Sequence, residues 1–197
     1  QREPDGFNTA FPAAAFEDTE LGWRLARHGL TIVYRASAVA FHHHRYDAAS
    51  FIRRQVKCGE AAAVLWRLRP ALARWTPLAD LEWRRLAELG AGAERRSKVA
   101  AVAAELETWE ARALTLAAAV EWEEAAPSEV LLRALFRYAY RKGLALALVP
   151  GEAGTRLAAA CYLELLPAAV GRWALDMGRA GHHVPVDEHR AIVGLAG

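Results

Sequence analysis

The distribution of hydrophobic and polar positions along the chain changes near Pro70. Before this proline, two short runs rich in β-branched and aromatic residues, Thr31–Tyr34 and Ala38–Phe41, predict strands on either side of a turn. After it, strong helix formers dominate, and Pro and Gly residues delimit about four predicted helices. The pattern predicts an α/β segment over residues 1–70, an α-helical domain over residues 71–197, and a chain that is predominantly α.

The longest predicted helix runs from about Glu94 to Ala125 and carries a single apolar seam. The seam residues recur at alternating steps of three and four, which is typical of a helix that packs on another helix. A second helix is expected to begin at Ser128 and to run to about Ala147. A third, from about Ala153 to Met177, is expected to kink or end at Pro167.

Composition, net charge and cysteine content exclude several classes of protein. The 197 residues are 54% apolar and 24% charged, a balance that excludes global disorder. A net charge of +2 gives no general electrostatic basis for binding nucleic acid. The two cysteines, Cys58 and Cys161, fit neither a metal-ligand spacing nor a disulfide framework. The sequence contains no run of about 20 apolar residues and no signal-peptide pattern, so we expect a cytoplasmic protein.

An acidic cluster opens an amphipathic helix that is expected to end near Gly29. We expect Asp18 or Thr19 to cap this helix. Carboxylates at a helix N-terminus interact with the positive end of the helix dipole and tend to stay ionised. An ionised carboxylate held at the mouth of a cleft is suited to act as a general base. The residues themselves leave two interpretations open, a catalytic base and a plain capping cluster.

Three adjacent histidines follow the second predicted strand. Strand alternation places His42 and His44 on one face and His43 on the other. Two imidazoles that project together are able to bind a divalent metal or to contact a diphosphate. A solvated polar strand end is the alternative.

Two basic helices are predicted. On a helix that starts near Asp47 or Ser50, Arg53 and Lys57 share one face and, with Arg54, could neutralise a diphosphate. A solvated basic face is the other interpretation. The second helix carries an arginine at every fourth position, which suits either a solvent-exposed face or peripheral contact with an anionic membrane: Arg133, Arg137 and Arg141.

The combined order of these motifs resembles the C-terminal half of the catalytic domain of family-2 glycosyltransferases, which have the GT-A fold. The resemblance covers about the first third of the chain and rests on these segments: Asp5-Gly6-Phe7-Asn8, Phe16-Glu17-Asp18, Trp23-Arg24-Leu25, Gly29, Ile32-Val33-Tyr34, His42-His43-His44 and Lys57-Cys58-Gly59. Asn8 departs from the family, which usually has Asp after Gly-Phe. The family's N-terminal half, with its Asp-x-Asp metal motif, has no counterpart here, so we expect a C-terminal fragment that is inactive alone.

The resemblance implies an inverting transfer of a sugar from a nucleotide-diphosphate donor to the hydroxyl of a saccharide or lipid-linked acceptor, assisted by Mn²⁺ or Mg²⁺. Asp18 would be the base, with Glu17 orienting the acceptor or supporting the base, and His42 and His44 would contribute to the metal site. Substrate or diphosphate contacts are expected at six further residues: Glu20, Trp23, Arg24, Arg53, Arg54 and Lys57. The alternative is a non-catalytic helical module that binds a protein or a membrane.

Overall fold

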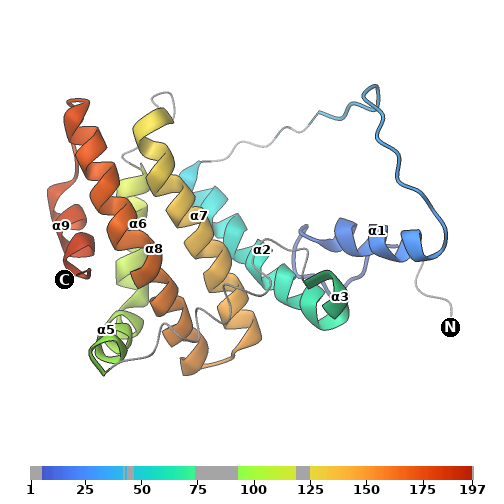
Figure 1. The fold of residues 1–197 in the computed structure, drawn as a ribbon, viewed down its shortest axis with the longest axis horizontal. Coiled ribbons are helices and arrows are strands. Elements are labelled where there is room, and N and C mark those ends of the chain that lie inside the picture. Colours follow the sequence, from blue (N-terminus) through green and yellow to red (C-terminus); the bar gives the residue numbers. More distant parts are fainter. Residues whose placement is uncertain (1–5, 42, 44–46, 74–92, 119–124, 197) are drawn as a thin grey trace.

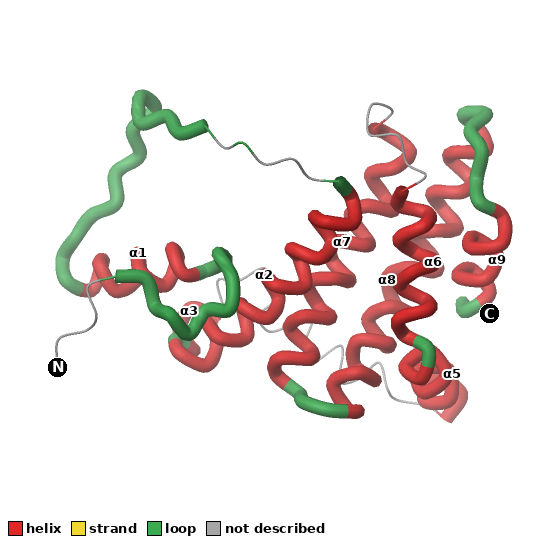
Figure 2. The backbone as a smooth tube through the Cα atoms, turned by 180° about the vertical axis from the view of Figure 1, so that it is seen from behind, coloured by secondary structure: helices red, strands yellow, loops and turns green. Residues whose placement is uncertain are grey.

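The computed structural model of the chain describes residues 6–41, 43, 47–73, 93–118 and 125–196. All regular secondary structure in these residues is helical, and Figure 2 shows no strand in them. The helices are α1 (Glu17–Arg27), α2 (Ala48–Leu68), α3 (Pro70–Ala73), α5 (Ala93–Ala104), α6 (Leu106–Ala118), α7 (Ala125–Leu148), α8 (Glu152–Arg179) and α9 (Val186–Gly194).

The predicted α/β remnant of a GT-A fold is therefore wrong. Thr31–Tyr34 and Ala38–Phe41 form no strands; they belong to an arm that extends away from the helices between α1 and α2 (Figure 1). Its side chains are exposed, with Tyr34 at 90% and Phe41 at 86%. The preference of such residues for strands depends on packing against neighbouring strands, and the described part of the chain supplies none.

The centre of the molecule is a layer formed by α2, α7 and α8. Helix α7 lies between the other two and packs along both of them, while α5, α6 and α9 pack against the layer through contacts with α8, α2 and one another (Figure 1). Large side chains from three of these helices are fully buried in the core, notably Trp173, Tyr162, Leu116 and Leu131. Burial of this apolar surface is the main stabilising contribution to the bundle.

Two glycines allow the backbones of α2 and α7 to come close together. A Cβ atom at Gly59 would overlap the carbonyl oxygen of Tyr140, and one at Gly143 would overlap the carbonyl oxygen of Val56. The two glycines therefore face opposite helices in a reciprocal arrangement. Because the backbone itself blocks the added atom, a larger residue at either position would push the helices apart.

The helices differ from the sequence-based expectation at four places. The helix predicted over Glu94–Ala125 is interrupted at Glu105, where an i−3 hydrogen bond tightens the chain between α5 and α6 and leaves Leu106 buried. Helix α8 continues through Pro167, because buried side chains on both sides of this proline offset the lost backbone hydrogen bond. Helix α7 begins at Ala125 rather than Ser128, and the sequence analysis did not predict α9.

The Gly59→Ala variant tests the close approach of α2 and α7. In an unconstrained helix this change stabilises by about 1 kcal/mol, but here we expect a loss of roughly 1–3 kcal/mol because of overpacking against Tyr140. Chemical denaturation measures the difference. Gly178→Ala is the matched control, because nothing lies within 4 Å of the added Cβ atom; equal stabilisation of both variants would contradict the proposed contact.

Candidate functional site

The acidic cluster lies at the start of α1, as predicted, but its capping residue differs. The N-cap is Phe16, whose φ of 65° places it in the left-handed region and whose side chain makes no capping hydrogen bond. The expectation that Asp18 or Thr19 caps α1 is therefore wrong. A left-handed conformation of a bulky residue costs roughly 1–3 kcal/mol, which the surrounding contacts must offset.

Asp18 is exposed and lies in the first turn of α1. Its Oδ1 atom accepts hydrogen bonds from the backbone nitrogen of Thr19 at 2.7 Å and from the Thr19 hydroxyl at 3.3 Å. These contacts are local to the first turn and leave the carboxylate accessible from solvent. The position of Asp18 is compatible with proton transfer to or from a molecule outside the helix.

Glu17 is directed toward the body of the protein, at the junction of α1, α2 and α7. Its Oε2 atom is buried and has no hydrogen-bond partner among the described residues. The adjacent Phe16 ring packs edge-on against Tyr140 of α7, with ring centroids 6.5 Å apart. Both rings belong to a small apolar cluster around Ala62, Ala63 and Leu144. Packing of Phe16 in this cluster explains how its strained backbone is maintained.

Cys58 of α2 lies at the same junction. The guanidinium of Arg54 donates a long hydrogen bond to its Sγ atom, with 3.9 Å between Nη1 and Sγ. Burial raises the pKa of the Cys58 thiol above its ordinary value, the positive charge of Arg54 lowers it, and the negative charge of Glu17 raises it. The thiol is therefore held in its protonated form near neutral pH.

Glu20 forms the centre of a buried ion-pair network. Its side chain is fully buried and accepts hydrogen bonds from Arg24 Nε at 3.0–3.1 Å and from Arg69 Nε at 3.0 Å. Arg24 also donates to the carbonyl oxygen of Gly6 at 2.5 Å. These bonds join α1 to the segment before it and to the C-terminal end of α2. Contact of Glu20 and Arg24 with a substrate remains a prediction, and in this structure both side chains hold α1 in place.

Trp23 is enclosed by two arginines. The guanidinium carbons of Arg27 and Arg69 lie 4.9 Å and 4.8 Å from the ring of Trp23, which is within the range of cation–π attraction. Arg69 therefore contacts both Glu20 and Trp23. The two contacts fix the same face of α1 against the end of α2.

The basic residues of α2 lie on the surface. The helix begins near the predicted start: Asp47 caps it in a capping box with Ser50, and the hydrogen bond from the Ser50 backbone lowers the pKa of the Asp47 carboxyl. Arg53 and Lys57 are exposed, and Lys57 forms an ion pair with Glu60 at 2.8 Å. Of the three predicted diphosphate-binding residues, Arg54 is the one that the structure brings to Cys58 and thereby to Glu17.

His42 and His44, the predicted metal ligands, lie outside the described residues. Within the described ranges, no three His, Cys, Asp or Glu side chains are grouped closely enough to hold a metal ion. The same part of the chain includes no helix with the length and apolar character needed to cross a membrane.

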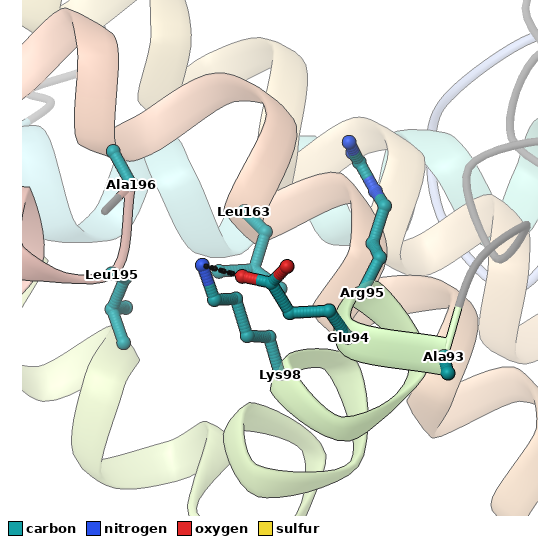
Figure 3. Close-up of a pocket in the computed structure, with 7 residues that line it drawn as sticks. All are labelled: Ala93, Glu94, Arg95, Lys98, Leu163, Leu195 and Ala196. Atoms are coloured by element: carbon teal, nitrogen blue, oxygen red, sulfur yellow. Dashed lines mark ion pairs between the residues drawn. The ribbon is translucent and has the colours of Figure 1, made fainter.

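A cavity of about 490 Å³ (Figure 3) lies beside α5, on the side of the bundle away from α1 (Figure 1). It is bounded by α5, α8 and the C-terminal residues, and Glu94 and Lys98 form an ion pair of 3.2 Å at its wall. The cavity is lined by Ala93, Glu94, Arg95, Lys98, Leu163, Leu195 and Ala196. None of these is a site residue predicted from the sequence. The cavity is therefore separate from the acidic cluster.

Sequence reasoning missed two features of the junction. Tyr140 is far from α1 in the sequence and lies in a regular amphipathic helix, so no local signal marks it. Cys58, for which the sequence indicates neither a metal-ligand nor a disulfide role, is half-buried beside charged groups. Their contacts, of Tyr140 with Phe16 and of Cys58 with Glu17, join segments that are far apart in the chain.

The Glu20→Ala variant tests what holds α1 in place. Removal of this carboxylate leaves Arg24 and Arg69 without their shared counter-charge, and breaking such a buried pair costs about 3–5 kcal/mol. We expect α1 to detach, which limited trypsin digestion would detect as faster cleavage after Arg27. Glu60→Ala breaks a more exposed ion pair and should change stability by at most about 1 kcal/mol. Similar cleavage rates in the two variants would refute the role of Glu20.

The reactivity of Cys58 tests the placement of Glu17. Glu17→Gln removes a negative charge that raises the pKa of the thiol, so the pKa should fall and alkylation should become faster at a given pH below it. Arg54→Met should have the opposite effect. The pH profile of iodoacetamide reaction at Cys58, followed by mass spectrometry, measures both. A profile that Glu17→Gln leaves unchanged would contradict this geometry; Glu107→Gln, an exposed change on α6, is the control.

Comparison with known proteins assigns neither a family to the chain nor a role to these residues. Neither models of protein families, nor curated proteins, nor solved structures give a match to the chain.

Proposed function

We propose that the chain supplies the acceptor side of an inverting glycosyltransferase that resembles family 2. In this proposal, Asp18 is the general base, and the acceptor hydroxyl approaches the first turn of α1. The sugar comes from a nucleotide-diphosphate donor that is bound by a separate donor-binding unit.

One observation carries the proposal: unlike Glu20, neither of the two adjacent carboxylates at the start of α1 forms an ion pair with a described residue. Asp18 is exposed and hydrogen-bonds only with the neighbouring Thr19, and the Oε2 atom of Glu17 is buried without a partner among the described residues. Glu20, one turn later, shows what a structural carboxylate looks like in this protein, because arginines surround it. Unexplained polar groups of this kind are typical of functional sites.

The chemistry requires one proton transfer and one substitution. Asp18 takes the proton of the acceptor hydroxyl while the oxygen forms a bond to the anomeric carbon of the donor. The bond from that carbon to the diphosphate breaks on the opposite side, so the configuration inverts and the nucleoside diphosphate leaves with the electron pair. A positioned base typically contributes 10²- to 10⁴-fold in rate.

The donor-binding unit and the divalent metal belong to the proposal. The metal would be held mainly by residues outside this chain, with His42 and His44 as the predicted contribution of the chain itself. The exposed arm supports an interaction with a further polypeptide, because it presents six large apolar side chains to solvent: Leu30, Ile32, Val33, Tyr34, Val39 and Phe41. Together, acceptor and donor units would supply the orientation from which much of the rate enhancement comes.

A second candidate is a non-catalytic helical module that binds a protein. The all-helical fold of the described residues favours it, because these helices form a common hydrophobic core without a sheet. In that case, the arm would serve as a binding segment and the carboxylates of α1 would have no chemical role.

The Asp18→Asn variant separates these candidates. In the complete gene product, assayed with nucleotide sugars and Mn²⁺ or Mg²⁺, we expect a loss of transfer of at least about 10²-fold, because asparagine cannot accept the proton. Donor binding, measured by calorimetry, should remain nearly unchanged. The chain alone should not turn over nucleotide sugars, because it lacks the donor side.

The matched control is Asp187→Asn, an acidic residue in the first turn of α9 that has no part in the proposed chemistry. Full transfer activity in Asp18→Asn would refute the role of Asp18. Absence of donor binding and of transfer in the complete wild-type product would favour the helical module.

A further inference from the structure

Arg95 of α5 carries a cation without a counter-charge at the wall of the cavity in Figure 3. Its Nε atom is buried and has no hydrogen-bond partner among the described residues. The side chain forms no ion pair with any residue in this part of the chain either. Buried polar groups are hydrogen-bonded in the large majority of folded proteins, so this donor requires an explanation.

The cavity has a charged side and an apolar side. The first turns of α5 supply the charged side, with Glu94, Arg95 and Lys98. The apolar side includes Leu163 of α8 and Leu195, which are half-buried and pack on the hydrophobic core. The volume of about 490 Å³ lies within the range of small-molecule sites. A cavity with these two sides suits a small molecule that has one charged end and one apolar end.

The charges of the lining residues determine the sign of that charged end. Lys98 forms an ion pair of 3.2 Å with Glu94, so these two charges compensate each other. Figure 3 shows the guanidinium of Arg95 directed away from this pair. The lining residues therefore carry one uncompensated positive charge, which a monoanion balances. A phosphate dianion would leave an excess of negative charge beside Glu94.

The guanidinium group further favours a carboxylate. Its N–H donors form a planar fork that matches the two oxygens of a carboxylate group. A hydrogen bond between two ionised groups is also stronger than one to a neutral alcohol. A cationic ligand would be repelled by Arg95.

We propose that the cavity binds an organic monocarboxylate with an apolar chain, with the carboxylate on Arg95 and the chain against Leu163 and Leu195. This site is independent of the proposed transferase chemistry. The acidic cluster belongs to α1, which lies on the other side of the bundle (Figure 1).

The test is titration of the full chain with sodium octanoate, followed by isothermal calorimetry. We expect octanoate to bind about tenfold more tightly than 1-octanol, because the alcohol lacks the charge-assisted hydrogen bonds to the guanidinium. Octylammonium, which has the same chain and the opposite charge, should bind more weakly than either. Inorganic phosphate at the concentration of octanoate should not displace it.

Arg95→Met removes the guanidinium and keeps an apolar side chain of similar length. We expect it to weaken octanoate binding about tenfold or more and to leave octanol binding nearly unchanged. Arg96→Met is the matched control, because Arg96 is the next residue of α5, is exposed and does not line the cavity. It should change neither affinity.

Glu94→Gln gives a second measurement that does not depend on changing Arg95. The Glu94 side chain is 84% exposed, so we expect the variant to fold normally. Loss of its negative charge should strengthen octanoate binding about two- to fivefold and should not affect octanol. A merely structural role for these side chains would not produce opposite effects on the carboxylate in the two variants.

Four results would overturn the proposal: no octanoate binding by the wild type, equal affinities for octanoate and octanol, displacement of octanoate by phosphate, or unchanged octanoate binding in Arg95→Met. Circular dichroism shows whether Arg95→Met folds. If it does not fold, Glu94→Gln decides the question, and unchanged or weaker octanoate binding in that variant would overturn the proposal.

Discussion

The close contact between the backbones of α2 and α7 is the constraint on which the rest of the structure depends. Gly59 and Gly143 each face a carbonyl oxygen of the opposite helix, so no side chain fits between the two backbones there. Cys58 and Tyr140 adjoin this contact, and Phe16 packs on Tyr140 from α1. The contact between α2 and α7 therefore positions the Tyr140 ring against which Phe16, at the start of α1, packs.

Two carboxylates one turn apart on α1 show how differently the fold treats the same chemical group. Glu20 is fully buried, but Arg24 and Arg69 neutralise it, and the resulting network fixes α1 to the end of α2. Glu17 has a buried oxygen without such compensation in the described part of the chain. The stabilising network around Glu20 holds in place the neighbouring turn, where Glu17 is incompletely satisfied. Stability supplied at one position thereby supports an unsatisfied group at another.

The arm between α1 and α2 shows that strand propensity alone does not produce a strand. Its β-branched and aromatic residues favour strands only where neighbouring strands pack against them, and those contacts are absent from the described residues. The same limit applies to Pro167, whose helix-breaking tendency is overcome by buried neighbours in α8. In both cases the surroundings of a residue, which lie outside its local sequence, determine the outcome.

The sequence by itself determined the helical character of the larger part, the start of α2 near Asp47, and the place of Glu17 and Asp18 in the first turn of a helix. These features depend on interactions between residues near one another in the chain. Tertiary structure alone decided that Arg69 pairs with Glu20, that Tyr140 packs against Phe16, and that Cys58 interacts with Glu17. These contacts join distant segments through packing of whole helices, and packing of that kind leaves no periodic or spacing signal in the sequence.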